Sequence, residues 1–177
     1  MSNTTNSAPE IALHGRRVLV TGSARGLGEA FVRALVDAGA RVIISDVLHE
    51  RGQALAEAMG TATCYVPMDL SDPASIESGV AQAAAQWGGL DGLVNNAAIT
   101  NSGGKAMHEL GVDMWDRVMQ VNVRGTWLAT VAAQKHLAAS QSGRIVNIAS
   151  DTALWGAPQL PAYVASKSAV VSMTAAM

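Results

Sequence analysis

The sequence predicts a single α/β domain built on a doubly wound parallel sheet. Short apolar runs alternate with longer amphipathic runs, in the order strand then helix, at a spacing that suits βα units rather than hairpins. Two of the strand-like runs, 42–44 and 145–148, are continuously apolar, as expected of parallel strands that helices cover on both faces. A glycine-rich turn, Thr21–Gly28, joins the first strand to the first helix.

The same alternation places each element. We expect strands near 16–21, 41–46, 62–66, 90–95 and 143–149, and helices near 26–38, 49–59, 73–87, 112–140 and 161–177. Gly39 and Gly60 follow the first two helices, and Ser71-Asp72-Pro73 supplies a cap and a first-turn proline for the third. Residues 1–13 are expected to form a flexible N-terminal tail, and 14–177 the domain.

Composition narrows the classes of function. The chain has 177 residues, 49% of them hydrophobic, and a net charge of −2 with acids and bases interspersed, so neither nucleic acid nor a membrane surface is an expected partner. The polar N-terminus and the absence of a long apolar run favour a soluble cytoplasmic protein. The single cysteine, Cys64, reads as a buried small hydrophobe, and no metal site is expected because the histidines are scattered: His14, His49, His108 and His136.

The turn Thr21–Gly28 has the pattern T-G-x-x-x-G-x-G. Glycine tolerates the dihedral angles of a tight turn and lets a ligand lie against the backbone. The helix that follows directs its unpaired N–H groups and positive dipole end toward a pyrophosphate. The pattern therefore predicts a Rossmann-type dinucleotide site, with an ordinary tight turn as the alternative.

Asp46, at the end of the second strand, favours NAD over NADP as the cofactor. Its carboxylate would accept hydrogen bonds from the adenine ribose hydroxyls and repel a 2′-phosphate. Arg25 in the glycine turn favours the opposite preference, because a guanidinium there could pair with a 2′-phosphate. Asp46 could also act as the N-cap of the following helix, and the two roles are compatible.

Tyr163 and Lys167 are the residues with the clearest chemical role. Four positions apart on a helix, they lie on one face, where the ammonium favours the phenolate and makes the phenol usable as an acid or base. Ser150 ends the apolar strand 143–149, so its hydroxyl would face the same crevice as the cofactor.

Taken together, these motifs resemble those of the short-chain dehydrogenase/reductase family, of the single-domain type that oxidises alcohols or reduces ketones. The motifs fall in the family's order over 14–177: Thr21 to Gly28, Asp46, Asp69-Leu70, Asn95-Asn96-Ala97, Asn122, Ser150, and Tyr163 with Lys167.

The resemblance implies a catalytic role for four of these residues. Tyr163 would exchange a proton with the substrate oxygen while hydride passes between substrate carbon and nicotinamide. Lys167 would assist Tyr163 and bond the nicotinamide ribose, and Ser150 would hold and polarise the reacting oxygen. Asn122 would hold a water that relays protons from Lys167 to solvent, although it could merely bridge backbone in a helix kink.

The resemblance also implies a cofactor-binding set. Asp69 would contact the adenine through its side chain and Leu70 through its backbone, although Asp69 could simply cap its own turn. Asn95 would line the cofactor cleft. The full set is Gly22, Ser23, Arg25, Gly26, Leu27, Gly28, Asp46, Asp69, Leu70, Asn95, Ala97, Tyr163 and Lys167.

Trp155 lies between Ser150 and Tyr163, in a loop that should border the substrate. Together with Leu154 and Leu160 it suggests an apolar or cyclic alcohol or ketone, held by Ser150, Trp155 and Tyr163.

The chain departs from the family pattern in two places. Ala98 replaces a usual glycine, and the sequence stops ten residues after Lys167, before the family's last strands. We therefore expect an incomplete sheet with an exposed apolar edge. Three hypotheses follow: an NAD-dependent dehydrogenase present as a truncated chain, a non-catalytic dinucleotide-binding fragment, or a subunit completed by another chain. By analogy with the family, the assembly would be a homodimer or homotetramer.

Overall fold

The computed structural model describes residues 12–101 and 103–177 and contains one five-stranded sheet. The strands are β1 (Arg17–Thr21), β2 (Arg41–Asp46), β3 (Thr63–Pro67), β4 (Gly92–Asn95) and β5 (Arg144–Asn147). All pair in parallel, in the order β3-β2-β1-β4-β5. Because the chain moves outward from β1 to β3 and then crosses to β4, the sheet is doubly wound, which confirms the predicted fold class.

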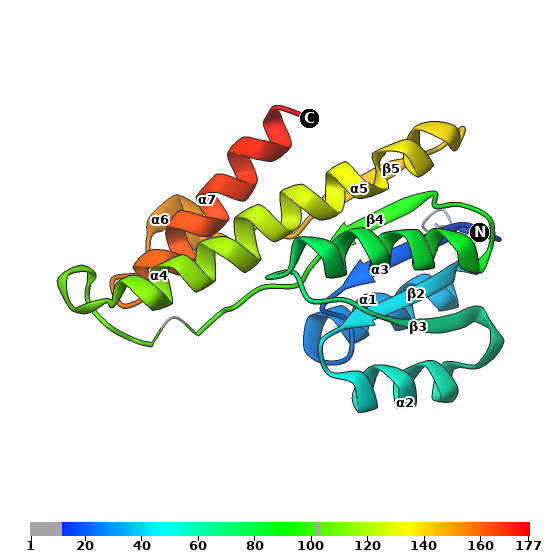
Figure 1. Ribbon diagram of the computed structural model, residues 1–177, viewed down its shortest axis with the longest axis horizontal. Coiled ribbons are helices and arrows are strands. Elements are labelled where there is room, and N and C mark those ends of the chain that lie inside the picture. Colours follow the sequence, from blue (N-terminus) through cyan, green and yellow to red (C-terminus); the bar gives the residue numbers. More distant parts are fainter. Residues whose placement is uncertain (1–11, 102) are drawn as a thin grey trace, which may run out of the picture.

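Helices connect the strands (Figure 1). They are α1 (Gly26–Asp37), α2 (His49–Met59), α3 (Pro73–Gln86), α4 (Val112–Met119), α5 (Thr126–Ala139), α6 (Thr152–Trp155) and α7 (Pro161–Ala175). Short 3₁₀ turns, η1 (Gly60–Ala62) and η2 (Met107–Glu109), complete the set. The Asp72 carboxylate accepts a hydrogen bond from the Ala74 N–H, so α3 begins with the predicted cap and proline.

Two hydrophobic clusters cover the two faces of the sheet. Alternate residues of a strand face opposite ways, so Leu19 and Ile43 pack under α3 and α5, whereas Val20 and Ile44 pack against α1 and α2. In Figure 1, α3 and α5 cross in front of the sheet, while α4, α6 and α7 gather beyond the carboxyl ends of the strands.

The first described residues differ from the expected tail. The Leu13 N–H donates to the Ala38 carbonyl at 2.7 Å, and the Leu13 side chain packs against the cluster beneath α1. The ordered domain therefore includes this residue, while residues 1–11 of the expected tail lie outside the described part of the chain.

The helix expected over 112–140 is present over 112–139, but it is not α-helical throughout, because a π-helical segment, η3 (Gln120–Gly125), lies between α4 and α5. Asn122 and Gly125 explain this wider turn. Asn122 is buried and bonds another part of the chain, and a Cβ on Gly125 would lie 2.6 Å from the Leu70 carbonyl oxygen. Such single-turn insertions often occur at functional sites.

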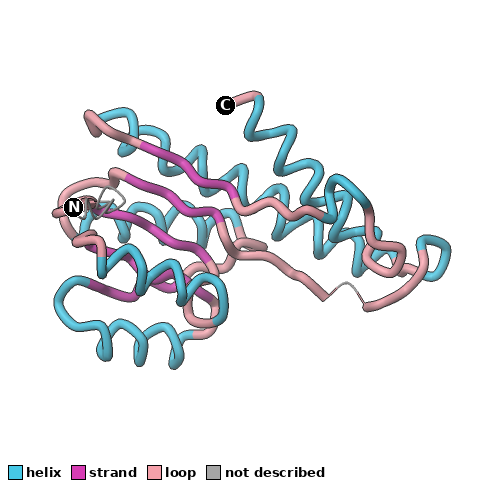
Figure 2. The backbone as a smooth tube through the Cα atoms, turned by 180° about the vertical axis from the view of Figure 1, so that it is seen from behind, coloured by secondary structure: helices cyan, strands magenta, loops and turns pink. Residues whose placement is uncertain are grey.

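Strand β5 forms one edge of the sheet, pairing only with β4. Val146 remains 51% exposed, and the view from behind leaves β5 open on this face (Figure 2). The expected apolar edge is therefore present. Across 12–101 and 103–177, no helix has the length and apolar character needed to cross a bilayer.

Candidate functional site

A cavity of about 620 Å³ lies at the carboxyl ends of the strands. The loops after the five strands form one part of it, and α1, α4, η3 and α7 contribute the remainder. Its lining residues include Thr21, Gly22, Arg25, Gly26, Leu27, Gly28, Ser45, Asp46, Met68, Asp69, Leu70, Asn96, Ala97, Ile99, Thr100, Arg117, Val121, Ile148, Tyr163 and Lys167. The crevice outside the carboxyl ends, where strand order reverses, is where doubly wound sheets bind ligands.

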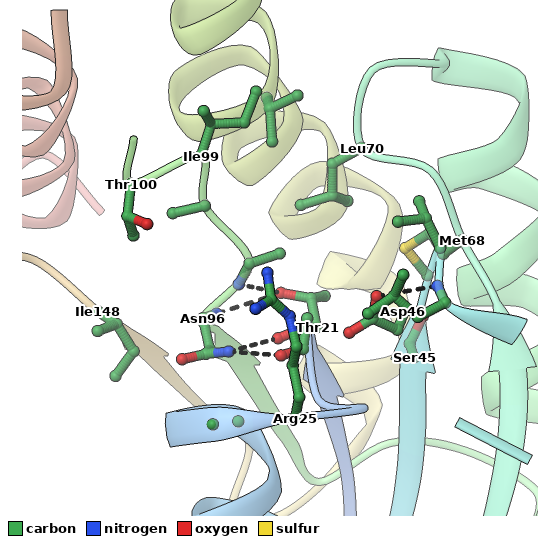
Figure 3. A pocket seen from close by; sticks show the side chains of 18 of the residues that line it. Thr21, Arg25, Ser45, Asp46, Met68, Leu70, Asn96, Ile99, Thr100 and Ile148 are labelled. Atoms are coloured by element: carbon green, nitrogen blue, oxygen red, sulfur yellow. Dashed lines mark hydrogen bonds between the residues drawn. The ribbon is translucent and has the colours of Figure 1, made fainter. Parts of the chain in front are cut away.

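The glycine turn is joined to the loop after β4. The Asn96 side chain donates to the carbonyls of Thr21 and Gly22 at 3.0 and 2.9 Å, and Thr21 Oγ1 accepts from the Asn96 N–H at 3.1 Å (Figure 3). Gly22 has a φ of +63°, and a Cβ there would lie 2.6 Å from Ala97 Cα. Only glycine fits this position.

Ser23 lies beneath the turn rather than in the cavity. Its hydroxyl is fully buried, donates to the Val20 carbonyl at 2.7 Å, and accepts from the Ser45 N–H at 2.9 Å. This side chain therefore supports the turn from below, joining β1 to β2.

Asp46 is buried and lines the cavity next to Ser45 (Figure 3). Its Oδ2 accepts from the Ala24 N–H at 3.0 Å and its Oδ1 accepts from the Leu48 N–H at 3.1 Å. Leu48, not Asp46, is the N-cap residue of α2. Each carboxylate oxygen thus has one backbone donor and retains capacity to accept from a ligand.

Asp69 and Leu70 follow β3 on the same side of the cavity. Asp69 is exposed, and its Oδ1 accepts from the Ser71 N–H at 2.8 Å, so it does cap its own turn. The cavity lining includes both residues, so capping leaves Asp69 facing a ligand.

Tyr163 and Lys167 lie on α7 at the other side of the cavity. The Lys167 ammonium lies 5.9 Å from the centre of the Tyr163 ring and donates to the Ile148 carbonyl at 2.5 Å. Burial of Lys167, which is 4% exposed, lowers its pKa to about 8. An ammonium has three N–H donors, so two remain for other partners.

Asn122 supports the cavity wall from behind. Its Oδ1 accepts from the Ile99 N–H at 2.8 Å, and its Nδ2 donates to the Ile99 carbonyl and to Ser166 Oγ, each at 3.0 Å. The side chain therefore joins the loop after β4 to α7, next to Lys167. The alternative interpretation, in which Asn122 bridges backbone groups, therefore describes this side chain. The backbone groups belong to Ile99 in the loop after β4 rather than to the helix that carries Asn122.

Five predicted residues lie outside the cavity lining: Ser23 and Asn122, described above, and Asn95, Ser150 and Trp155. Asn95 donates to Thr130 Oγ1 at 3.0 Å and to Asn147 Oδ1 at 2.8 Å, behind the cleft that Asn96 lines. The half-buried Ser150 hydroxyl accepts from Thr152 Oγ1 at 2.9 Å. Trp155 is 66% exposed on α6.

Sequence reasoning missed several lining residues, among them Ser45, Met68, Ile99, Thr100, Arg117, Val121 and Ile148, and it named Asn96 only as part of a family motif. Met68, Asn96 and Ile148 each directly follow a strand, so their places at the carboxyl edge could have identified them. Arg117 gave no such signal, because it reaches the cavity from the last turn of α4. Among the described residues, no cluster of three or more His, Cys, Asp or Glu side chains could hold a metal ion.

Comparisons with known proteins agree with this geometry. The sequence profile of the short chain dehydrogenase family matches residues 16–177. Together, the sheet order, the glycine turn and the cavity define a doubly wound α/β protein of the Rossmann type. This chain belongs to the short-chain dehydrogenase/reductase family.

Among individual relatives, sorbitol dehydrogenase of Cereibacter sphaeroides is 39% identical over 163 residues, 92% of this chain and 63% of the relative. A 3-alpha-(or 20-beta)-hydroxysteroid dehydrogenase of Mycobacterium tuberculosis is 38% identical over 92% of this chain and 62% of its own length. The chain thus spans less than two thirds of these relatives.

Solved structures show the same similarity. A 3-ketoacyl-(acyl-carrier-protein) reductase from Brucella melitensis, complexed with NADH, superposes with a TM-score of 0.89 at 34% identity, over 93% of this chain and 69% of that one. A gluconate 5-dehydrogenase from Burkholderia cenocepacia, in complex with NADP and tartrate, gives 0.88 at 33% identity, over 95% and 66%.

Proposed function

We propose that this chain carries the cofactor site and the proton-transfer residues of a nicotinamide-dependent oxidoreductase that interconverts secondary alcohols and ketones. The observation that carries the proposal is one cavity lined by the glycine turn and Asp46 on one side and by Tyr163 and Lys167 on the other. Its volume is typical of a cofactor site.

Three features of the cavity fit a dinucleotide. A Cβ built on Gly26 meets no atom within 4 Å, so a ligand has room against this backbone. Helix α1 starts there without a side-chain cap, which leaves its first N–H groups for an anion. Ser45 Oγ is buried at the cavity wall with no hydrogen-bond partner, and a buried hydroxyl without a partner is a candidate ligand contact.

NAD is the proposed cofactor. The Asp46 carboxylate, fixed by two backbone N–H groups, would accept from ribose hydroxyls and repel a 2′-phosphate. Arg25 also lines the cavity and is the residue that would favour NADP. We propose that Asp46 dominates, because its carboxylate is buried and fixed while Arg25 is exposed.

A nicotinamide cofactor held in this cavity would supply the hydride chemistry between an alcohol carbon and a ketone carbon. Tyr163 takes the hydroxyl proton in oxidation and donates it in reduction. Lys167 favours the phenolate through its charge and bonds the cofactor ribose with its remaining donors. Ser150 is proposed to bond the reacting oxygen and Asn122 to hold the wall beside Lys167, which together give the Tyr-Lys-Ser-Asn set.

An apolar or cyclic alcohol is the proposed substrate class. Ile99, Val121 and Ile148 give the cavity apolar walls, while Leu154 and Trp155 are exposed nearby on α6. Two relatives are named for a hydroxysteroid and for a cyclohexadienediol. A homodimer or homotetramer and a cytoplasmic location are proposed by family analogy.

The test is fluorescence titration with NADH, followed by turnover of NAD with cyclic secondary alcohols. Tyr163→Phe should lower turnover by about 10²-fold or more while leaving NADH affinity within about threefold, because the phenol acts in proton transfer. Ser150→Ala, which removes the hydroxyl proposed to bond the reacting oxygen, should also lower turnover and leave NADH affinity unchanged.

Each result selects one hypothesis. Turnover that Tyr163→Phe removes supports the dehydrogenase. NADH binding without turnover supports a non-catalytic fragment, and turnover only at concentrations where the chain assembles supports a subunit completed by another chain. Failure to bind NADH rejects the proposal.

A further inference from the structure

Tyr65 contacts the main chain of Asp46, the residue proposed to select the cofactor. The Tyr65 hydroxyl donates to the Asp46 carbonyl at 2.7 Å, from the neighbouring strand β3. The Met68 N–H reaches the same carbonyl at 3.4 Å. Asp46 is therefore held by its carbonyl from β3 and by its carboxylate from the glycine turn and from α2.

The direction of these hydrogen bonds can be deduced. His49 Nδ1 lies 3.1 Å from the Tyr65 hydroxyl oxygen. A backbone carbonyl only accepts, so the single phenol hydrogen points to Asp46, and His49 must carry a hydrogen on Nδ1 and donate it to Tyr65. Burial, and then the Asp46 charge, raise the pKa of the Tyr65 phenol above its ordinary value, so the phenolate is disfavoured further.

The ring of Tyr65 is also fixed in place. It packs against the cluster beneath α1 and α2 and lies edge-on to the His49 ring, with centres 6.1 Å apart. Gly52 on α2 makes room for it, because a Cβ on Gly52 would overlap Tyr65 Cε2. The hydroxyl consequently has little freedom to leave the Asp46 carbonyl.

We infer that Tyr65 is a positioning residue for cofactor selection, which holds the turn after β2 so that the Asp46 carboxylate faces the adenosine ribose. The inference rests on the proposed function. It assigns selectivity to a residue outside the cavity lining, one that acts only through Asp46.

The test compares dissociation constants for NADH and NADPH in the full chain. Tyr65→Phe keeps the ring and removes only the hydroxyl, and it should reduce the preference for NADH by about three- to tenfold, the effect of one hydrogen bond. In the Asp46→Ala background the same substitution should change the NADH constant by less than about twofold, because there is no carboxylate left to position.

Thr63→Val is the matched control. Thr63 lies on the same strand, and its hydroxyl also bonds the α2 side of the fold, donating to the Ala56 carbonyl at 2.9 Å, but it makes no contact with Asp46. Thr63→Val should lower the thermal midpoint of unfolding about as much as Tyr65→Phe does, and it should leave the NADH preference unchanged. A merely structural role for Tyr65 predicts equal behaviour of the two variants.

The outcomes separate the inference from the proposed function. A wild-type chain that prefers NADH, with the same preference in Tyr65→Phe, overturns the inference alone. A wild-type chain that binds neither nucleotide, or both equally, overturns the proposed cofactor and the inference with it. Should Tyr65→Phe fold poorly, His49→Ala at an exposed position replaces it, with an expected reduction of about twofold; an unchanged ratio there overturns the inference.

Discussion

Lys167 brings a positive charge into the interior of the domain. Its ammonium has one backbone acceptor, the Ile148 carbonyl, and neither salt bridge of the described residues involves it. Removing a charge from water costs free energy that one hydrogen bond does not offset, so the neutral form is favoured and the pKa falls to about 8. The residue proposed to assist proton transfer therefore titrates close to neutral pH.

This burial predicts a pH-dependent stability. Between about pH 8 and 10.5 the unfolded chain keeps the Lys167 proton while the folded chain has released it, so the free energy of unfolding rises with pH. Below pH 8 the buried charge destabilises the fold by on the order of 3 kcal/mol. Lys167→Met should thus be more stable than wild type at pH 7, with the difference shrinking toward pH 10.

Urea unfolding at several pH values measures that difference. Burial raises the pKa of the Cys64 thiol to about 11, which lowers stability at high pH in both proteins, so the comparison isolates Lys167. Parallel stability profiles of the two proteins would contradict the assignment.

At the scale of elements, the turn between β1 and α1 contains glycines required for different reasons. A Cβ on Gly28 would overlap the Gly22 carbonyl and lie 2.7 Å from Asn96 Nδ2, so Gly28 is required by packing. Gly26, with a φ of +59°, faces open space. Gly28 thus serves the packing of the fold, whereas Gly26 leaves room for the proposed ligand.

Alanine substitutions should separate these roles. Gly28→Ala should lower the free energy of unfolding by about 3 kcal/mol, because backbone rather than a flexible side chain must move. Gly26→Ala should cost only about 1 kcal/mol of backbone strain yet weaken NADH binding, since its methyl group enters the cavity. Urea unfolding and NADH titration check both. Equal losses of stability in the two variants would refute the distinction.

The positions of most strands and helices could be predicted from the sequence, but the π-helical segment could not. Strand and helix positions follow from apolar periodicity, and β2 and α2 match their predicted bounds because local pattern and tertiary packing agree there. The π-helical segment was missed because its cause is tertiary: Asn122 bonds Ile99, which lies 23 positions earlier. No local pattern encodes such a contact.

The site divides in the same way. The glycine turn, Asp46, Tyr163 and Lys167 could be placed from motifs, because each sits at a strand end or on one helix face. The direction of each side chain could not be predicted from motifs, as Asn95 and Asn96 show: they are adjacent in the sequence but face different surroundings. Asn95 bonds Thr130 and Asn147 across the sheet, whereas Asn96 bonds the glycine turn.

At the scale of the whole molecule, the cavity lies between two parts of the fold. The sheet supplies the glycine turn and Asp46, while α4 and α7 lie beyond the carboxyl ends of the strands (Figure 1). Polar contacts join the parts near the cavity: Asn122 bonds Ile99, Lys167 bonds the Ile148 carbonyl, and Gln120 and Arg124 both donate to the Ser71 carbonyl. A ligand that bonds both sides would stabilise only the assembled arrangement.

Nucleotide binding should therefore stabilise the molecule across this boundary. At a concentration one hundred times its dissociation constant, NADH should add about 2.7 kcal/mol to the free energy of unfolding. Amide exchange should slow both in the glycine turn, 22–28, and in the first turns of α7, 161–168. Lys167→Met should keep the protection of the glycine turn and lose much of the protection of α7, because it removes the donors on α7.

Protection confined to the glycine turn and the end of β2 in the wild-type chain would mean that only the adenosine half is bound. That result would favour the non-catalytic fragment over the dehydrogenase, since proton transfer requires α7 to contact the nicotinamide half.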